Sequence, residues 1–142
     1  MNLRIDKVIR SVGFGFRKVY SIILTNDGLY LIRTGNVGAL KHYQIDPASA
    51  QPATTRPTDR DVRELQANEA RIDAEPFEQL LADRESYQVR LEAIEEVETK
   101  AGKTPAMLIK VTGSDHYLTF PFASFEEVQT FQRALNKWSF KS

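Results

Sequence analysis

Apolar residues follow one another at strand-like spacing in the first third of the chain. Residues 19–25 and 29–33 are rich in β-branched and aromatic side chains, and Asn26-Asp27-Gly28 stands between the two runs. Glycine takes the positive φ angle that a tight turn needs, so we predict a β-hairpin here. Residues 3–12 predict a preceding strand, in which the imperfect alternation after Ile5 indicates a bulge or a bend.

The middle of the chain changes from a strand pattern to a loop and then to a helix. A short fourth strand is predicted at residues 39–45. Residues 46–58 contain three prolines and no apolar periodicity, which is typical of an exposed loop. Residues 58–84 then predict a helical insertion that is interrupted at Pro76. The apolar side chains of this insertion form a thin stripe on one side, consisting of Val62, Leu65, Ile72 and Phe77.

The pattern returns to strands in the last third of the chain. Residues 87–97 alternate between apolar and polar side chains, with a shift of register at Ala93-Ile94. Residues 107–111 and 117–122 flank the turn residues Gly113-Ser114-Asp115, which predicts a second hairpin.

A helix is predicted to close the chain. Ser124 and Glu127 have the spacing of a capping box, which marks the start of a helix over residues 124–138. Its apolar residues repeat at helical spacing, and we expect them to tie the helix to the sheet: Phe125, Val128, Phe131, Leu135 and Trp138.

Composition is that of an ordinary globular protein. A chain of 142 residues is long enough to bury a core, and we take residues 1–142 as a single domain. The absence of cysteine excludes disulfides, thiol catalysis and cysteine-ligated metals. No apolar run has the length of a membrane span or of a signal peptide, so we expect a soluble cytoplasmic protein.

The net charge of zero hides a separation of charges. Residues 1–45 hold seven basic and two acidic side chains, whereas residues 59–103 hold seven basic and thirteen acidic ones. The basic part either faces an anionic surface or complements the acidic part within the fold. Because the whole protein is neutral, we do not expect nucleic acid as a partner.

Motifs for catalysis and for cofactors are incomplete. Gly102-Lys103-Thr104 resembles the end of a phosphate-binding loop, but Val97 stands where that motif needs glycine. His42 and His116 have no ligand neighbours at the helical spacing of a metal site. Ser114-Asp115-His116 contains the residue types of a catalytic triad, but three consecutive residues cannot form its hydrogen-bonded chain. We therefore expect no enzymatic activity, no metal and no cofactor.

Three segments carry a resemblance to a known family: residues 22–32, 87–94 and 118–125. They resemble the pleckstrin-homology-like (PH-like) barrel, in particular the small bacterial PH-like and GRAM-type domains. The resemblance implies an α+β fold in which an antiparallel β-barrel of about seven strands is closed by a C-terminal helix. The helical insertion at residues 58–84 departs from the pattern of that family.

The function expected from this reading is binding or scaffolding without catalysis. Barrels of this kind have exposed edges to which an extended peptide can add, so we expect recognition of a protein, with self-association as one form of it. A bare barrel does not need the helical insertion, which makes its apolar stripe the first candidate for a partner surface: Val62, Leu65, Ile72 and Phe77. The other reading of this stripe is that the helix covers an open end of the barrel.

The alternative function is peripheral contact with anionic lipid headgroups. Lipid-binding members of the family gather Lys and Arg in the first hairpin loop, and the nearest equivalents here are Arg10, Arg17, Lys18 and Lys41. Each basic group near an anionic membrane contributes about 1 kcal/mol, so the four together reach roughly millimolar binding.

Overall fold

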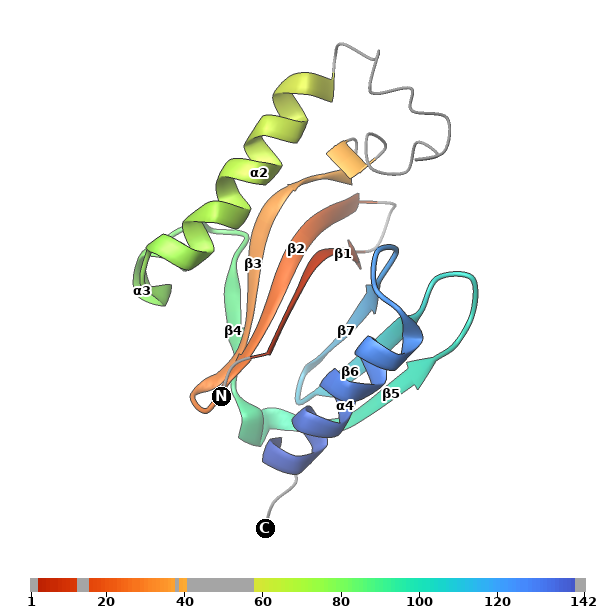
Figure 1. Cartoon of the computed structure of the whole chain (residues 1–142). Coiled ribbons are helices and arrows are strands. Elements are labelled where there is room, and N and C mark those ends of the chain that lie inside the picture. Colours follow the sequence, from red (N-terminus) through yellow and green to blue (C-terminus); the bar gives the residue numbers. More distant parts are fainter. Residues whose placement is uncertain (1–2, 13–15, 38, 41–57, 140–142) are drawn as a thin grey trace.

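A computed structural model of the chain describes residues 3–12, 16–37, 39–40 and 58–139. Its strands form one antiparallel sheet of seven strands in the order β4-β3-β2-β1-β7-β6-β5 (Figure 1). The strands are β1 (Leu3–Val12), β2 (Phe16–Thr25), β3 (Gly28–Asn36), β4 (Tyr87–Val89), β5 (Ile94–Lys100), β6 (Ala106–Val111) and β7 (Ser114–Thr119).

Helices cover the sheet on two sides. Helix α2 (Thr58–Ala74) packs along β3 and is followed by the short α3 (Phe77–Leu80), so helices are present in the predicted segment 58–84 up to Leu80, and residues 81–84 form turns and a bend. Helix α4 (Phe125–Ser139) packs against β5 and against the 3₁₀ turn η2 (Leu91–Ala93) (Figure 1). The predicted capping box opens α4, because Glu127 N donates to Ser124 Oγ over 3.1 Å and Ser124 N to the Glu127 carboxylate over 3.0 Å.

The sheet curves strongly, because its two edge strands are consecutive in the sequence. Only the four residues Arg90–Ala93 separate β4 from β5. This length of chain spans less than about 20 Å, so the two edges of the sheet must approach each other. No hydrogen-bonded pairing joins β4 to β5 within the described residues, and the sheet is therefore barrel-like but not closed.

Two sequence predictions near the N-terminus are confirmed. The hairpin of β2 and β3 turns at Asn26-Asp27, with Thr25 paired to Gly28. The expected irregularity in β1 lies between Ile5 and Val8, where Lys7 has a φ angle of 57°. Such a bulge bends the strand, which lets β1 pair with β2 along its length and with β7 at Ile9 and Arg10.

Two other predictions need correction. Ala39 and Leu40, predicted to begin a fourth strand, are helical and buried. Residues 41–45 of that prediction and residues 46–57 of the predicted loop 46–58 lie outside the described part of the chain, and Thr58 begins α2. The run at residues 87–97 divides into β4 and β5, which lie at opposite edges of the sheet. The expected number of strands agrees, but the insertion lies between the third and fourth strands and not after the fourth. Short apolar runs fit a helix and a strand equally well, which explains the first error.

Strands β2 and β3 are buried on both faces. The concave face holds the main core, in which Ile22, Leu24 and Leu31 pack with Phe120 and Phe131. The convex face carries two smaller apolar clusters. One consists of Ile9, Val19, Ala39, Leu40 and Leu65, and the other of Ile23, Tyr30, Ile32 and Leu80. Strands covered on both faces are apolar almost throughout, which is the pattern of residues 19–25 and 29–33.

Substitution of Gly28 tests the close approach of β4 to the first hairpin. A Cβ atom at this position would lie 2.6 Å from Gln88 Nε2 and 3.1 Å from the carbonyl oxygen of Val89, at a φ angle of +155°. We expect Gly28→Ala to lower the free energy of unfolding by about 2–3 kcal/mol, measured by urea denaturation. Gly113→Ala is the control, because Gly113 has a φ angle of +91° with open space around it, and strain alone costs about 1 kcal/mol. Equal losses in the two variants would show that the contact with β4 contributes nothing.

Candidate functional site

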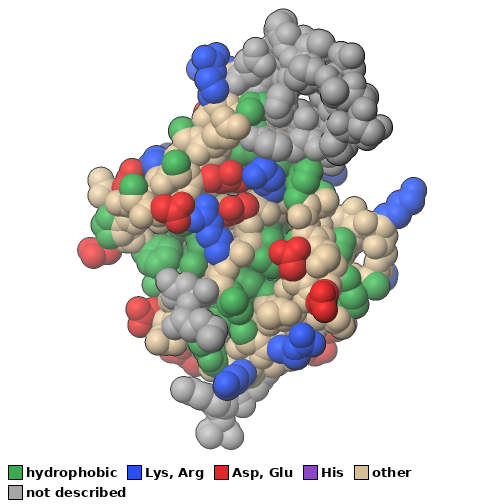
Figure 2. All heavy atoms as spheres, viewed as in Figure 1, with side chains coloured by type: hydrophobic (Ala, Val, Ile, Leu, Met, Phe, Trp, Pro, Cys, Tyr) green, Lys and Arg blue, Asp and Glu red, His purple; other side chains and the backbone are tan. Residues whose placement is uncertain are grey.

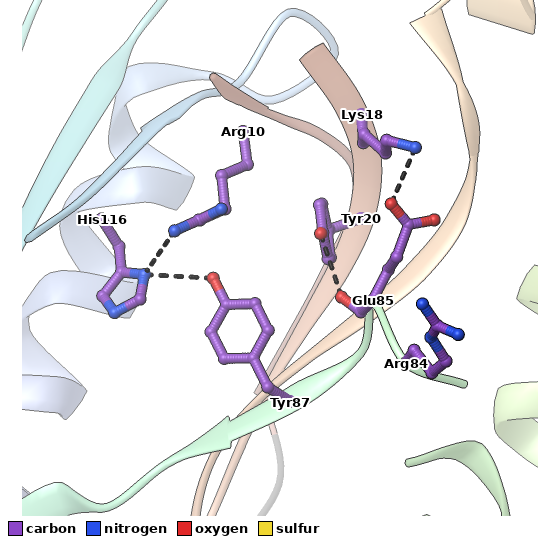
Figure 3. A pocket seen from close by; sticks show the side chains of 7 residues that line it. All are labelled: Arg10, Lys18, Tyr20, Arg84, Glu85, Tyr87 and His116. Carbon is purple, nitrogen blue, oxygen red and sulfur yellow. Dashed lines mark hydrogen bonds and ion pairs between the residues drawn. The ribbon is translucent and has the colours of Figure 1, made fainter. Parts of the chain in front are cut away.

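A cavity of about 650 Å³ opens at one end of the concave face (Figure 3). Its walls come from β1, β2, β7, β4 and the segment that leads into β4. We call it the mouth pocket and define it by the seven residues that line it: Arg10, Lys18, Tyr20, Arg84, Glu85, Tyr87 and His116.

The strand pattern explains why a polar pocket adjoins the apolar core. Alternate residues of a strand point to the same face, so a step of two residues stays on the concave side of the sheet. On four strands, a core residue is followed two positions away by a polar or aromatic residue that lines the pocket. All four of these pocket residues lie at the same end of the sheet. The pairs are Val8 and Arg10 on β1, Ile22 and Tyr20 on β2, Val89 and Tyr87 on β4, and Leu118 and His116 on β7.

His116 lies at the centre of a contact among three strands. Its Nδ1 atom lies 3.3 Å from Arg10 Nη2 and 3.1 Å from the hydroxyl oxygen of Tyr87. Arginine can only donate, so Nδ1 accepts and the proton of the neutral ring is on Nε2, which lies 3.5 Å from Ser114 Oγ. The Tyr87 ring stacks on the imidazole with centroids 5.4 Å apart, and Arg10 Cζ lies 5.3 Å from the centroid of the same ring (Figure 3).

Burial fixes the protonation states in the pocket. Burial lowers the pKa of His116, and the positive charge of Arg10 lowers it further, against a smaller opposing effect of Asp115. Burial also raises the pKa of the Tyr87 and Tyr20 hydroxyls. At neutral pH the imidazole is therefore uncharged, and Tyr87 keeps the proton that it donates.

Glu85 is the one carboxylate among the seven residues that line the mouth pocket. Its two carboxylate oxygens lie 2.7 Å from Lys18 Nζ and 2.9 Å from Arg33 Nε, the latter an ion pair without hydrogen-bond geometry. Its backbone carbonyl accepts a hydrogen bond of 3.0 Å from the Tyr20 hydroxyl. The lining thus combines three cationic side chains with one carboxylate, and its net charge is positive.

The residues proposed for lipid binding fall in different places. Arg10 and Lys18 are paired across β1 and β2 and both line the mouth pocket. Arg17 is exposed, and as the neighbour of Lys18 along β2 it points to the opposite face of the sheet. Lys41 lies outside the described residues. The structure therefore brings two of the four side chains together.

Five residues of the pocket did not emerge from the sequence as site residues: Tyr20, Arg84, Glu85, Tyr87 and His116. A signal for His116 was present, because it shares the two-residue alternation of Leu118 and Phe120, which are both fully buried. A polar residue that continues an inward-facing apolar series is a candidate for the rim of a core. No such local signal exists for Arg84 and Glu85, which precede β4 in a turn.

The apolar stripe of the insertion packs on the protein's own sheet. Val62 and Leu65 are 7% and 0% exposed, and Leu65 belongs to the convex-face cluster with Val19. Ile72 is half-buried, and the Phe77 ring stacks on Tyr30 with centroids 4.0 Å apart and an angle of 9° between the planes. In the structure this stripe is thus turned towards the convex face of the protein's own sheet, and the helices cover that face.

Ion pairs account for much of the separation of charges along the chain. The basic first third contacts the acidic part of the chain through Arg4–Asp73 at 2.8 Å, Lys7–Glu69 at 3.2 Å and Lys18–Glu85 at 2.7 Å. Figure 2 shows acidic and basic side chains side by side next to α2. The two charged segments thus complement each other within the fold. Arg10 and Arg17 have no carboxylate partner among the described residues.

Three further observations bear on the class of this protein. None of the helices in the described part of the chain has the length and apolar character needed to cross a membrane. Within residues 3–12, 16–37, 39–40 and 58–139, no three His, Asp or Glu side chains gather as metal ligands. Neither a protein-family model, nor a curated protein, nor a solved structure matches this chain, so its function must be argued from the geometry of the mouth pocket.

Proposed function

We propose that this protein is a non-enzymatic binding module that holds an anionic group in the mouth pocket. The observation that carries the proposal is the convergence of three cationic side chains, from separate elements, on one cavity that holds a single carboxylate: Arg10, Lys18 and Arg84. Positive charge in a concave site that is partly shielded from water attracts anions more strongly than the same charge on a convex surface.

Contacts within the pocket hold two of these cations in place before a ligand arrives. Arg10 lies against the Tyr87 ring and His116, and Lys18 is paired with Glu85. A side chain that is already ordered loses less conformational entropy on binding than a free surface lysine or arginine. The mouth pocket therefore supports anion binding better than the scattered basic residues of the sequence do.

The architecture supports the PH-like resemblance as part of this proposal. The sheet combines a four-stranded unit, β1 to β4, with a three-stranded unit, β5 to β7, and a C-terminal helix follows. We include in the proposal that the fold is an open barrel of the PH-like type with an inserted helical cover between the third and fourth strands. Binding without catalysis is what that resemblance implies.

Recognition of a protein is the second candidate function. Tyr117 is 45% exposed and lines a cavity of about 350 Å³ together with Leu108 and Glu98 on the outer part of β5, β6 and β7. Exposed aromatic residues are common in protein interfaces. Addition of a strand at the β5 edge is the less favoured mode, because the Val97 carbonyl in the middle of β5 already accepts a hydrogen bond of 3.1 Å from Gln132 on α4.

A pair of arginine variants tests whether the anion site is the mouth pocket. We expect Arg84→Gln to weaken the binding of inorganic phosphate about fivefold, since one nearby charge contributes about 1 kcal/mol. Arg17→Gln is the matched control, because it removes the same charge from an exposed residue on the other face of β2, and it should change affinity less than twofold. Phosphate titrations followed by amide chemical shifts measure both affinities.

Vesicle sedimentation tests whether the anion bound by the pocket belongs to a membrane lipid. Phosphatidylcholine vesicles with and without phosphatidylglycerol are compared at low and at physiological salt, for the parent protein and both variants. Equal losses for Arg84→Gln and Arg17→Gln would mean that diffuse charge, and not the pocket, drives binding. No binding of phosphate and no binding of anionic vesicles would overturn the proposed function and leave recognition of a protein as the one to pursue.

A further inference from the structure

We infer that the group held in the mouth pocket is a tetrahedral dianionic oxyanion of the phosphate type, and that it enters together with a proton on His116. This inference rests on the proposed function and deepens it. It assigns a ligand class to the pocket, and it makes binding depend on pH in a defined direction.

The first argument is an excess of hydrogen-bond donors over acceptors around His116. Arg10 presents N–H groups only, and the Tyr87 hydroxyl also donates, while the neutral imidazole offers a single lone pair on Nδ1. Two donors therefore share one acceptor, at 3.3 Å and 3.1 Å. The buried Nε atom of Arg10 has no hydrogen-bond partner in the described part of the chain. A ligand that supplies several acceptors and no donors would complete this cluster, and an oxyanion is such a ligand.

The second argument is the balance of charge. Glu85 pairs with both Lys18 and Arg33, so that side of the pocket keeps one surplus positive charge. Arg10 and Arg84 remain without a carboxylate partner among the described residues. Two uncompensated cations favour a ligand with two negative charges over a monoanionic carboxylate.

The third argument concerns the groups that face His116. They are Arg10 from β1, Tyr87 from β4, and Ser114 and Asp115 from β7 itself, while the paired residue on β6 is the apolar Ile109. In the empty pocket a protonated imidazole would stand next to the guanidinium of Arg10, at the 3.3 Å contact. An oxyanion that contacts both groups offsets this repulsion and accepts a hydrogen bond from the protonated Nδ1. A tetrahedral group has enough oxygen atoms to accept from Arg10, His116 and Tyr87 together.

The direction of the pH dependence follows from linkage. In the empty pocket the pKa of His116 is lowered by burial and by Arg10, and a bound dianion raises this pKa. The oxyanion therefore binds more tightly as the pH falls from above the pKa of the complex to below that of the free protein. Each unit of separation between the two pKa values adds about tenfold to the affinity.

Sulfate is the probe for this coupling, because its charge does not change near neutral pH. We expect the parent protein to bind sulfate at least about tenfold more tightly at about pH 5 than at about pH 8. His116→Gln should bind sulfate weakly and with the same affinity at both pH values. His42→Gln is the matched control, because His42 is the other histidine of the chain, and it should keep the pH dependence of the parent. Calorimetry in buffers with different ionisation enthalpies measures the proton taken up per sulfate.

The sulfate titrations test the pH coupling and the proposed function separately. Sulfate binding with equal affinity at both pH values in the parent protein would overturn the coupling while the proposed function stands. Loss of the pH dependence in His42→Gln but not in His116→Gln would place the titrating group elsewhere. No sulfate binding at any pH, with no binding of phosphate, would overturn the proposed function itself.

Two matched phosphate monoesters separate a soluble source of the ligand from a lipid source. Glycerol 3-phosphate and vesicles that contain phosphatidic acid present the same chemical group, one in solution and one at a surface. Similar affinity for both, each reduced by Arg84→Gln, assigns the pocket to the phosphate group as such. Binding of the vesicles alone assigns it to a lipid surface, and loss of both forms of binding contradicts the ligand class.

Discussion

Replacing Phe131 by alanine should lower the free energy of unfolding by about 3–5 kcal/mol. Phe131 is 1% exposed and lies on α4, where it belongs to the core cluster of the concave face. The truncation removes most of a buried aromatic side chain and leaves a cavity that the neighbouring strands fill only in part. Small domains are stable by about 5–15 kcal/mol, so this single change removes a large share of the total.

Phe122→Ala is the control for that loss. The same chemical change is made at a residue that is 40% exposed, three residues before the start of α4. We expect it to cost less than about 1 kcal/mol. Urea denaturation followed by circular dichroism gives both values. Losses of equal size would mean that α4 does not seal the concave core in the way that its burial indicates.

Leu65→Ala should cost about 2–5 kcal/mol of local stability and release α2 from the sheet. Leu65 is fully buried, and its Cβ would lie 3.4 Å from a Cβ placed on Gly35, so helix and strand are in close contact here. The rest of the interface is thin, because much of α2 faces water or makes ion pairs. Hydrogen exchange measures the effect residue by residue, and the amides of α2 should lose protection while those of α4 keep it.

Glu64→Ala provides the comparison for Leu65→Ala, since Glu64 is the exposed neighbour on the same helix. It should leave the exchange pattern of α2 unchanged. If Leu65→Ala also left α2 protected, the pairs Arg4–Asp73 and Lys7–Glu69 would have to hold the helix instead. The comparison therefore separates apolar docking from ionic docking of the insertion.

Sequence patterns identified most of the secondary structure but not all of the strand order. The hairpin at Asn26-Asp27, the bulge after Ile5 and the capped helix that begins near Ser124 depend on neighbouring residues, and all three were predicted. The division of residues 87–97 was missed, because alternation reports which face a residue occupies and not which edge of the sheet its strand joins. Ala39 was assigned to a strand for the related reason that a short apolar run has no clear period.

Of the residues that line the mouth pocket, the sequence predicted only two, and it did so from their charge. Arg10 and Lys18 were found because basic residues are conspicuous in a sequence. His116 and Tyr87 became site residues only when β7 and β4, strands far apart in the sheet order, met across the concave face. The stripe that includes Leu65 was correctly recognised as apolar, but an apolar stripe predicts burial without saying whether the partner is another protein or the same chain.

The contact between Tyr87 and His116 has a mechanical consequence. These two side chains meet at 3.1 Å although their strands, β4 and β7, stand four places apart in a sheet that is not closed. The hydrogen bond between them spans the concave face, so any motion that flattens the sheet must lengthen this hydrogen bond. A change that parts Tyr87 from His116 therefore removes a polar link between the four-stranded and the three-stranded unit, and it leaves the Arg10–His116 contact between β1 and β7 as a second link at this end.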